Sequence, residues 1–175
     1  EYMNNLKFTE EDIDYLRGLN LFRDDFIDYL KSFKFCCDVW AVPEGTVIFP
    51  QEPIVTVKGP VIQALMVETM LLLTVNHQSL IATKANRLVR AAKGTAVAEF
   101  GTRRSIGYDS AFYGSRAAYI GGCVGTSGVV QGKKFGIPTM NTMIHSWVQM
   151  IESEYEAFCE YARQYPDDCS LVIDT

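Results

Sequence analysis

Strand-like runs alternate with helix-like segments along the second half of the chain, and this alternation restricts the fold more than any other feature. The strand-like runs lie at 96–100, 123–128, 137–145 and 170–175. The segments between them have helical patterns and end at glycine or proline. Because strands that alternate with helices build parallel sheets, we predict an α/β fold with a parallel sheet or barrel in this half.

The first half of the chain has a different pattern, which predicts a small α+β domain. Thr9 precedes three acidic residues, as at a helix N-terminus, and residues 23–33 repeat the pattern. Alternating apolar residues at 35–58 predict a small antiparallel sheet. The apolar run 61–75 is interpreted as a buried helix, followed by a helix that ends at Gly94. We therefore expect an N-terminal α+β portion with connecting helices at 1–94, and the first part of a barrel at 95–175.

Charge and cysteine content exclude several classes of function. A formal net charge of −5 argues against a broad nucleic-acid-binding face. The five cysteines include no C-x-x-C pair, which predicts reduced thiols without disulfides or zinc. These features favour a cytoplasmic protein.

The termini and the most apolar run bear on targeting. No secretory signal is visible, and the run 61–75, which includes Gln63 and Glu68, is too short to span a bilayer. We expect no membrane segment. The chain starts abruptly at Glu1 and stops at a strand-like run without a successor, so we interpret it as a portion of a longer protein.

Polar side chains follow each predicted strand of the second half. Because parallel strands end at one edge of a sheet, such residues gather there. Paired arginines suit a phosphate or carboxylate, and the glycine-flanked "VGTSG" resembles an anion-holding turn. The candidates in chain order are Arg103, Arg104, Thr126, Ser127, His145, Ser146 and Asp174.

Each candidate also has a purely structural interpretation. Adjacent arginines are often solvated, Gly-Thr-Ser-Gly is common in plain loops, and a lone histidine near a core is more often structural. An aspartate at a strand end often caps the next helix. We interpret His77 as structural. The functional interpretation rests on several strand ends being polar together, with no Walker loop, dinucleotide fingerprint or cysteine nucleophile in competition.

Several long motifs resemble one enzyme family in the order in which they occur. They are the segments 41–60, 99–129, 132–149 and 154–175, which include "EFGTRRS", "TMIHS" and "VIDT". The chain resembles nicotinate phosphoribosyltransferase, a type II phosphoribosyltransferase of NAD salvage, over essentially its whole length.

The resemblance implies a fold, a reaction and an assembly. The fold is a smaller α/β domain packed on a partial, irregular β/α barrel, and the assembly is a homodimer whose active sites draw residues from both subunits. The reaction joins nicotinate to phosphoribosyl pyrophosphate (PRPP), with ATP hydrolysed alongside and Mg²⁺ as the ion. Nicotinate mononucleotide and pyrophosphate are the products.

The resemblance also implies residue roles. ATP phosphorylates His145, and Asp174 is its hydrogen-bonding partner. Arg103 and Arg104 lie near the nicotinate carboxylate and the phosphates. The other substrate-binding positions are Phe100, Thr126, Ser127 and Ser146; no protein metal ligand is assigned.

Departures from the family pattern keep two alternatives open. Asn141 and Ile144 flank the histidine where Gly and Ala are usual; Gly128 and Ile106 replace polar residues. One alternative is therefore a non-catalytic, phosphate-binding dimeric relative. The other is a nicotinamide phosphoribosyltransferase, but the sister enzyme has Asp at the position of Ser127. A serine donates to a carboxylate, which an aspartate repels, so we favour nicotinate.

Overall fold

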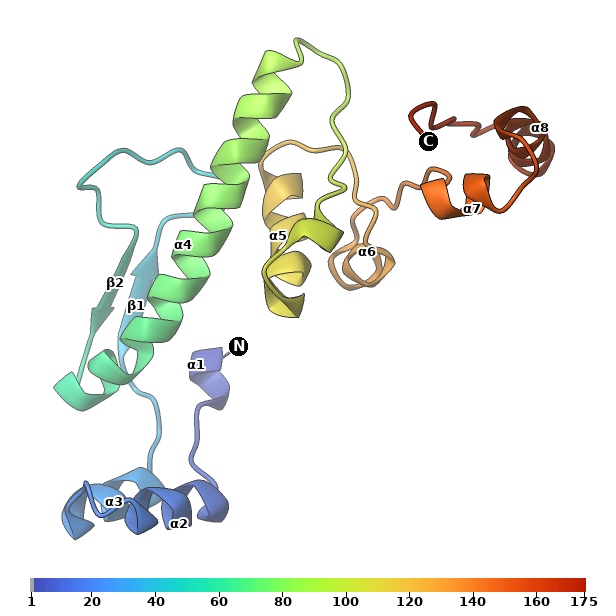
Figure 1. Cartoon of the computed structure of the whole chain (residues 1–175). Helices are drawn as coiled ribbons and strands as arrows, with labels where there is room; N and C mark the ends of the chain where they lie inside the picture. Colours follow the sequence, from blue (N-terminus) through green and yellow to red (C-terminus); the bar gives the residue numbers. More distant parts are fainter. Residues whose placement is uncertain (1) are drawn as a thin grey trace. The chain divides into compact units, whose positions relative to one another are not determined.

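The computed structural model describes residues 2–175, which divide into two compact units: a first unit that ends at Asn76 and a second unit, His77–Thr175. The domain boundary expected at residue 94 stays a prediction. Figure 1 shows the elements in chain order. They are α1 (Tyr2–Asn5), α2 (Glu10–Gly18), α3 (Asp24–Lys31), β1 (Asp38–Ala41), β2 (Val55–Lys58), α4 (Val61–Ala91), the 3-10 turn η1 (Thr102–Arg104), α5 (Tyr108–Ile120), α6 (Val129–Phe135), α7 (His145–Gln149) and α8 (Glu154–Gln164).

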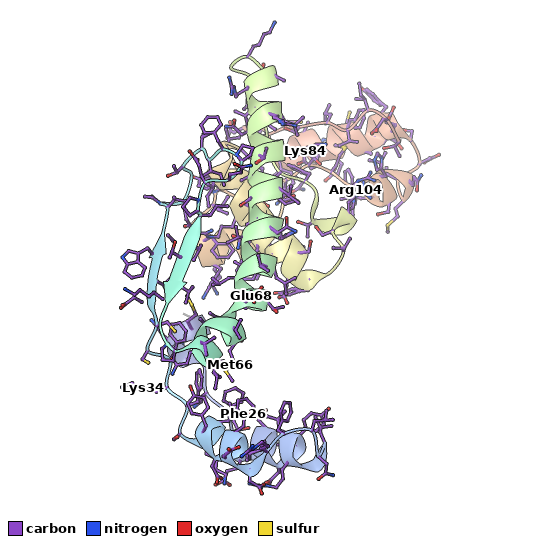
Figure 2. All side chains as sticks on the ribbon, turned by 90° about the vertical axis from the view of Figure 1, so that its left-hand side faces the viewer. Phe26, Lys34, Met66, Glu68, Lys84 and Arg104 are labelled. Atoms are coloured by element: carbon purple, nitrogen blue, oxygen red, sulfur yellow. The ribbon has the colours of Figure 1, made fainter. Side chains whose placement is uncertain are left out.

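Helices α2 and α3 form the core of the first unit, as the sequence predicts. Thr9 caps α2, and its hydroxyl accepts from the Asp12 amide while the Asp12 carboxylate accepts from the Thr9 amide. This reciprocal capping satisfies amides that have no partner inside the helix. The buried residues of this core are Ile13, Ile27, Leu30 and Phe33. Phe26 of α3 and Met66 of α4, both labelled in Figure 2, pack against them. Burying each large apolar side chain contributes about 2 kcal/mol.

The predicted antiparallel sheet is confirmed as one pair of strands. Val39 faces Val57, and Asp38 faces Lys58 at the end of the ladder. Pro43 and Gly45 lie near the start of the loop between the strands. Gly45 adopts a left-handed conformation with φ 80°. The sheet stops at β2 because Gly59 and Pro60 follow directly and α4 begins at Val61.

Helix α4 differs from the expected pair of helices and from the expected burial. It runs unbroken for 31 residues, since the residues between the two predicted segments include no glycine or proline. Leu65, Leu72 and Leu73 are each more than 60% exposed, so the prediction of a buried helix is wrong for much of its surface.

Among residues 2–175, α4 is the one helix long and apolar enough to cross a membrane by length and composition. The argument that the run 61–75 is too short therefore does not apply to the whole helix. Core helices of soluble proteins share these two properties, so they assign no membrane on their own. The absence of a membrane segment stays a prediction.

The second unit contains three parallel segments in place of the expected regular strands. Glu99 bridges Thr126, and Thr126 bridges Thr139, both in parallel orientation. Helix α5 connects the first two segments and α6 connects the second to the third. The parallel α/β arrangement is thus confirmed locally, although each pairing is too short to count as a strand. The packing of a barrel stays a prediction.

Among the described residues, one predicted strand is shorter than expected and another is absent. Residues 141–144 are irregular and His145 begins α7, so the strand expected at 137–145 ends near Met140. Residues 170–175 form no strand. Val172 packs instead on the buried residues Met143, Val148 and Ala157. The apolar pattern of these segments therefore reflects packing among α7, α8 and the chain end.

Close backbone approaches fix where the segments of the second unit meet. A Cβ on Gly125 would lie 2.7 Å from the Pro138 carbonyl oxygen, and one on Gly121 would lie 2.6 Å from the Ala82 carbonyl oxygen. Both distances are shorter than real Cβ contacts. Gly125 thus allows the second and third parallel segments to pair, and Gly121 allows α5 to end against α4.

Candidate functional site

The backbone places the carboxyl ends of the three parallel segments side by side. The Ser127 amide donates to the Glu99 carbonyl at 2.9 Å, and the Met140 amide donates to the Thr126 carbonyl at 2.9 Å. Residues that follow Glu99 and Thr126 therefore lie at one edge. We call Phe100, Arg103, Arg104, Thr126 and Ser127 the strand-end site.

The two arginines lie on the turn that follows the first segment. Arg103 and Arg104 form η1, and the Arg104 amide closes the turn on the Gly101 carbonyl at 2.8 Å. Both side chains are exposed, and no ion pair within residues 2–175 involves either. Phe100, just before them, is 42% exposed. The structure thus presents two unpaired guanidinium groups and an aromatic ring.

The Gly-Thr-Ser-Gly turn does not offer the backbone amides that the sequence suggested. The amides of Thr126 and Ser127 bond to Pro138 and Glu99 carbonyls, and the Gly128 amide bonds to the Thr126 hydroxyl. The prediction that several of these amides hold an anion is therefore wrong. The half-buried Ser127 side chain remains as a hydroxyl donor beside the arginine turn.

One residue that the sequence analysis missed is central to this site. The Glu99 carboxylate accepts hydrogen bonds from the Gly101 amide, the Ser115 hydroxyl and the Thr126 hydroxyl. Ser115 and Thr126 are both buried. The available signal was an acidic residue inside an apolar strand-like run, directly before Phe-Gly. A carboxylate in that position requires donors from neighbouring segments.

Cys123 is buried at the start of the second parallel segment. Burial raises the pKa of the Cys123 thiol, and the Glu99 carboxylate raises it further. A thiol that remains protonated is a poor nucleophile.

His145 lies in a separate group of polar residues, which we call the histidine cluster: His145, Asp174 and Thr175. Its Nδ1 is 3.0 Å from the Thr175 hydroxyl, and its Nε2 is 3.7 Å from an Asp174 carboxylate oxygen. The second distance is within ion-pair range but longer than a hydrogen bond. The His145 side chain is 43% exposed. Buried Met143 anchors the chain just before it.

The structure brings the predicted residues into two groups rather than one. No hydrogen bond or ion pair in the described part of the chain joins the histidine cluster to the strand-end site. Ser146 is exposed on α7. His77, interpreted as structural, contacts the Ser110 carbonyl through Nε2 at 3.1 Å.

The side chains that could bind a metal ion are scattered over the described part of the chain. Within residues 2–175, no group of three or more His, Cys, Asp or Glu side chains could hold a metal ion. Mg²⁺ commonly binds one or two carboxylates together with substrate phosphates. The described residues therefore form no such group of ligands, and a Mg²⁺ ion that arrives with the substrate phosphates stays a prediction.

A parallel α/β unit with unpaired arginines and a serine at its strand ends is typical of enzymes that bind small anionic substrates. Residues 1–76 match a family model described as the nicotinate phosphoribosyltransferase (NAPRTase) N-terminal domain. The "Nicotinate phosphoribosyltransferase pncB2" of Mycobacterium tuberculosis is 46% identical over 175 residues, which is 100% of this chain and 38% of that protein. The nicotinate phosphoribosyltransferase of Bacillus subtilis is 43% identical over 175 residues, again 100% of this chain and 36% of that protein.

A solved structure agrees with these sequence relatives. The crystal structure of human nicotinic acid phosphoribosyltransferase matches with a TM-score of 0.78 at 31% identity, covering 85% of this chain and 31% of that one. The chain is therefore similar to nicotinate phosphoribosyltransferases over its whole length. It spans 38% of the length of the mycobacterial relative.

Proposed function

We propose that the complete protein joins nicotinate to PRPP, forming nicotinate mononucleotide and pyrophosphate. The observation that carries the proposal is the pair of unpaired guanidinium groups, Arg103 and Arg104, beside the Thr126–Ser127 end of the neighbouring parallel segment. Guanidinium groups bind carboxylates and phosphates bidentately. Relatives named for this activity match the whole chain.

The reaction requires positioning and charge stabilisation rather than a protein nucleophile on the sugar. The bond between ribose C1 and the pyrophosphate oxygen breaks while the pyridine nitrogen bonds to C1. Positive charge develops on the ribose ring and negative charge on the departing pyrophosphate. Within this chain, the arginines bind anionic groups and Phe100 offers a face for the pyridine ring.

Ser127 supports nicotinate over nicotinamide as the base. Its hydroxyl is half-buried and lies at the same edge as the arginine turn. A hydroxyl donates to a carboxylate, and the arginines add positive charge. An acidic residue at this position would instead accept from an amide and repel a carboxylate.

For the coupled ATP hydrolysis, we assign the nucleophile to His145. The Asp174 carboxylate lies 3.7 Å from Nε2. On this proposal it favours the proton on Nε2, so that Nδ1 keeps the free electron pair. Nδ1 attacks the γ-phosphorus, the bond to the ADP oxygen breaks, and ADP leaves. Water then cleaves the N–P bond and releases inorganic phosphate, which completes the hydrolysis and restores the histidine. The Thr175 hydroxyl, which faces Nδ1, must rotate away before the attack.

We further propose a cytoplasmic homodimer, following the family resemblance.

Replacing each of the two histidines tests this assignment in the full-length protein. His145→Ala should lose ATP hydrolysis and the acid-labile phosphate formed with ATP, while PRPP-dependent synthesis survives without ATP stimulation. His77→Ala is the matched control, since the hydrogen-bond contact of its ring is to the Ser110 carbonyl and not to the histidine cluster. It should retain ATP coupling with a lower melting temperature. ATP-stimulated turnover by His145→Ala would end the assignment. A wild type without nicotinate-dependent turnover would favour a non-catalytic relative.

A further inference from the structure

One carboxylate connects the two chain segments that carry the strand-end site. Glu99 Oε1 accepts from the Gly101 amide in the following turn. Glu99 Oε2 accepts from the Ser115 hydroxyl of α5 and from the Thr126 hydroxyl of the neighbouring segment, both at 2.7 Å. Three donors from three different parts of the second unit therefore meet at one side chain.

The contact between Glu99 and Thr126 determines the conformation of the Gly-Thr-Ser-Gly turn. Thr126 is fully buried, with 0% exposure. Its hydroxyl donates to Glu99 and accepts from the Gly128 amide at 3.0 Å. A hydroxyl has a single proton, so donation to Glu99 turns its lone pairs toward Gly128. Through Thr126, Glu99 thus fixes the turn on which Ser127 lies.

The contact with Gly101 fixes the arginine turn in the same way. The Gly101 amide donates to Glu99, and the Gly101 carbonyl accepts from the Arg104 amide. A Cβ on Gly101 would lie 3.0 Å from Glu99 Oε1, so the carboxylate occupies the space beside this glycine. Glu99 takes part in no ion pair among the described residues. It acts here as an acceptor for neutral donors, not as a partner for either arginine.

We propose that Glu99 is a positioning residue for the base carboxylate. By holding the Gly101 amide and the Thr126 hydroxyl on one side chain, it sets the separation between the arginine turn and Ser127. Both groups can then bind the same carboxylate of nicotinate. This inference rests on the proposed function. It adds that Glu99 governs binding of the base and not binding of PRPP.

The replacement Glu99→Gln in the full-length protein tests the proposal. Glutamine keeps the size of the side chain but has one acceptor oxygen, so its amide NH₂ must face a former donor. Losing a charge-assisted hydrogen bond should raise KM for nicotinate about tenfold or more. KM for PRPP should stay unchanged. A residue with a purely structural role would not separate the two substrates in this way.

Two further variants keep the result interpretable. Ser115→Ala removes the donor on α5 only and should lower the melting temperature with no change in KM for nicotinate. Thr126→Val removes the hydroxyl that connects Glu99 to Gly128 and should repeat the nicotinate effect, even if Glu99→Gln folds poorly. Equal changes in both KM values, or none for nicotinate, would overturn the proposal.

A wild type without turnover would refute the proposed function but not, by itself, the role of Glu99. Calorimetry of nicotinate binding then compares the wild type with Glu99→Gln. Weaker binding by the variant would support the positioning role, and equal binding or no binding by either protein would overturn it.

Discussion

Single polar side chains hold the irregular parts of this chain at the residue scale. Gln63 is only 5% exposed; its Oε1 accepts from the Cys36 amide at 2.7 Å and its Nε2 donates to the Lys34 carbonyl at 3.0 Å. Glu99 does the same in the second unit. Both satisfy backbone groups of segments that have no regular structure of their own.

Arg103 is the residue whose loss should be most specific for the base. Arg103→Ala in the full-length protein should lower kcat/KM for nicotinate by roughly 30-fold or more, because a charged partner is lost from the substrate carboxylate. Arg163→Ala is the control, since Arg163 forms an ion pair with Glu160 on the same helix, α8, and lies outside the strand-end site. Steady-state kinetics with nicotinate, measured on both variants, test this prediction. Unchanged kinetics for both Arg103→Ala and Arg104→Ala would show that the two arginines are solvated surface residues without a role in binding.

At the element scale, the cap of α2 should make stability depend on pH. The Thr9 hydroxyl, and then the Thr9 amide, lower the pKa of Asp12 below 3.8. A lowered carboxyl pKa stabilises the fold above its unfolded value, and this stability is lost as the pH falls through the folded pKa. Asp12→Ala should therefore lower the melting temperature at neutral pH, with the difference from wild type shrinking toward about pH 3. A difference that is independent of pH would contradict this.

The elements of the first unit were predictable because their signals are local. Thr9 and the acids after it define α2, and Pro43 and Pro53 bound the loop between the two strands. The second unit was less predictable. The parallel segments are held by backbone bonds from Ser127 to Glu99 and from Met140 to Thr126, which no local pattern reports. An apolar run such as 170–175 looks like a strand whether it pairs or only packs.

The same distinction applies to the candidate site. Arg103, Arg104 and Ser127 were predictable because strand ends in a parallel sheet share an edge. Glu99 was not, since its role depends on Ser115 and Thr126, 16 and 27 residues away. The prediction of free amides in the Gly-Thr-Ser-Gly turn was wrong because the Thr126 and Ser127 amides pair with the neighbouring segments.

At the scale of the whole molecule, residues 1–175 expose an unusually apolar helix. Leu65, Leu72, Leu73 and Leu80 on α4 are each 62–65% exposed. Because contiguous apolar surface drives association, residues 1–175 expressed alone should aggregate or stay partly molten. Light scattering and dye binding measure this. The double variant Leu72→Lys with Leu80→Lys should associate less. A sharp cooperative melt with a monomeric profile for the unmodified chain would contradict the prediction.

The most direct test of the central claim is a single-turnover comparison of the two pyridine bases in the full-length protein. Wild-type protein is mixed with PRPP, Mg²⁺ and either nicotinate or nicotinamide, and the mononucleotide formed is quantified. Ser127, with the arginine turn beside it, predicts rapid formation of nicotinate mononucleotide and little product from nicotinamide. Preference for nicotinamide would contradict the assignment of Ser127 and the arginines to a carboxylate, and no product from either base would contradict the proposed reaction.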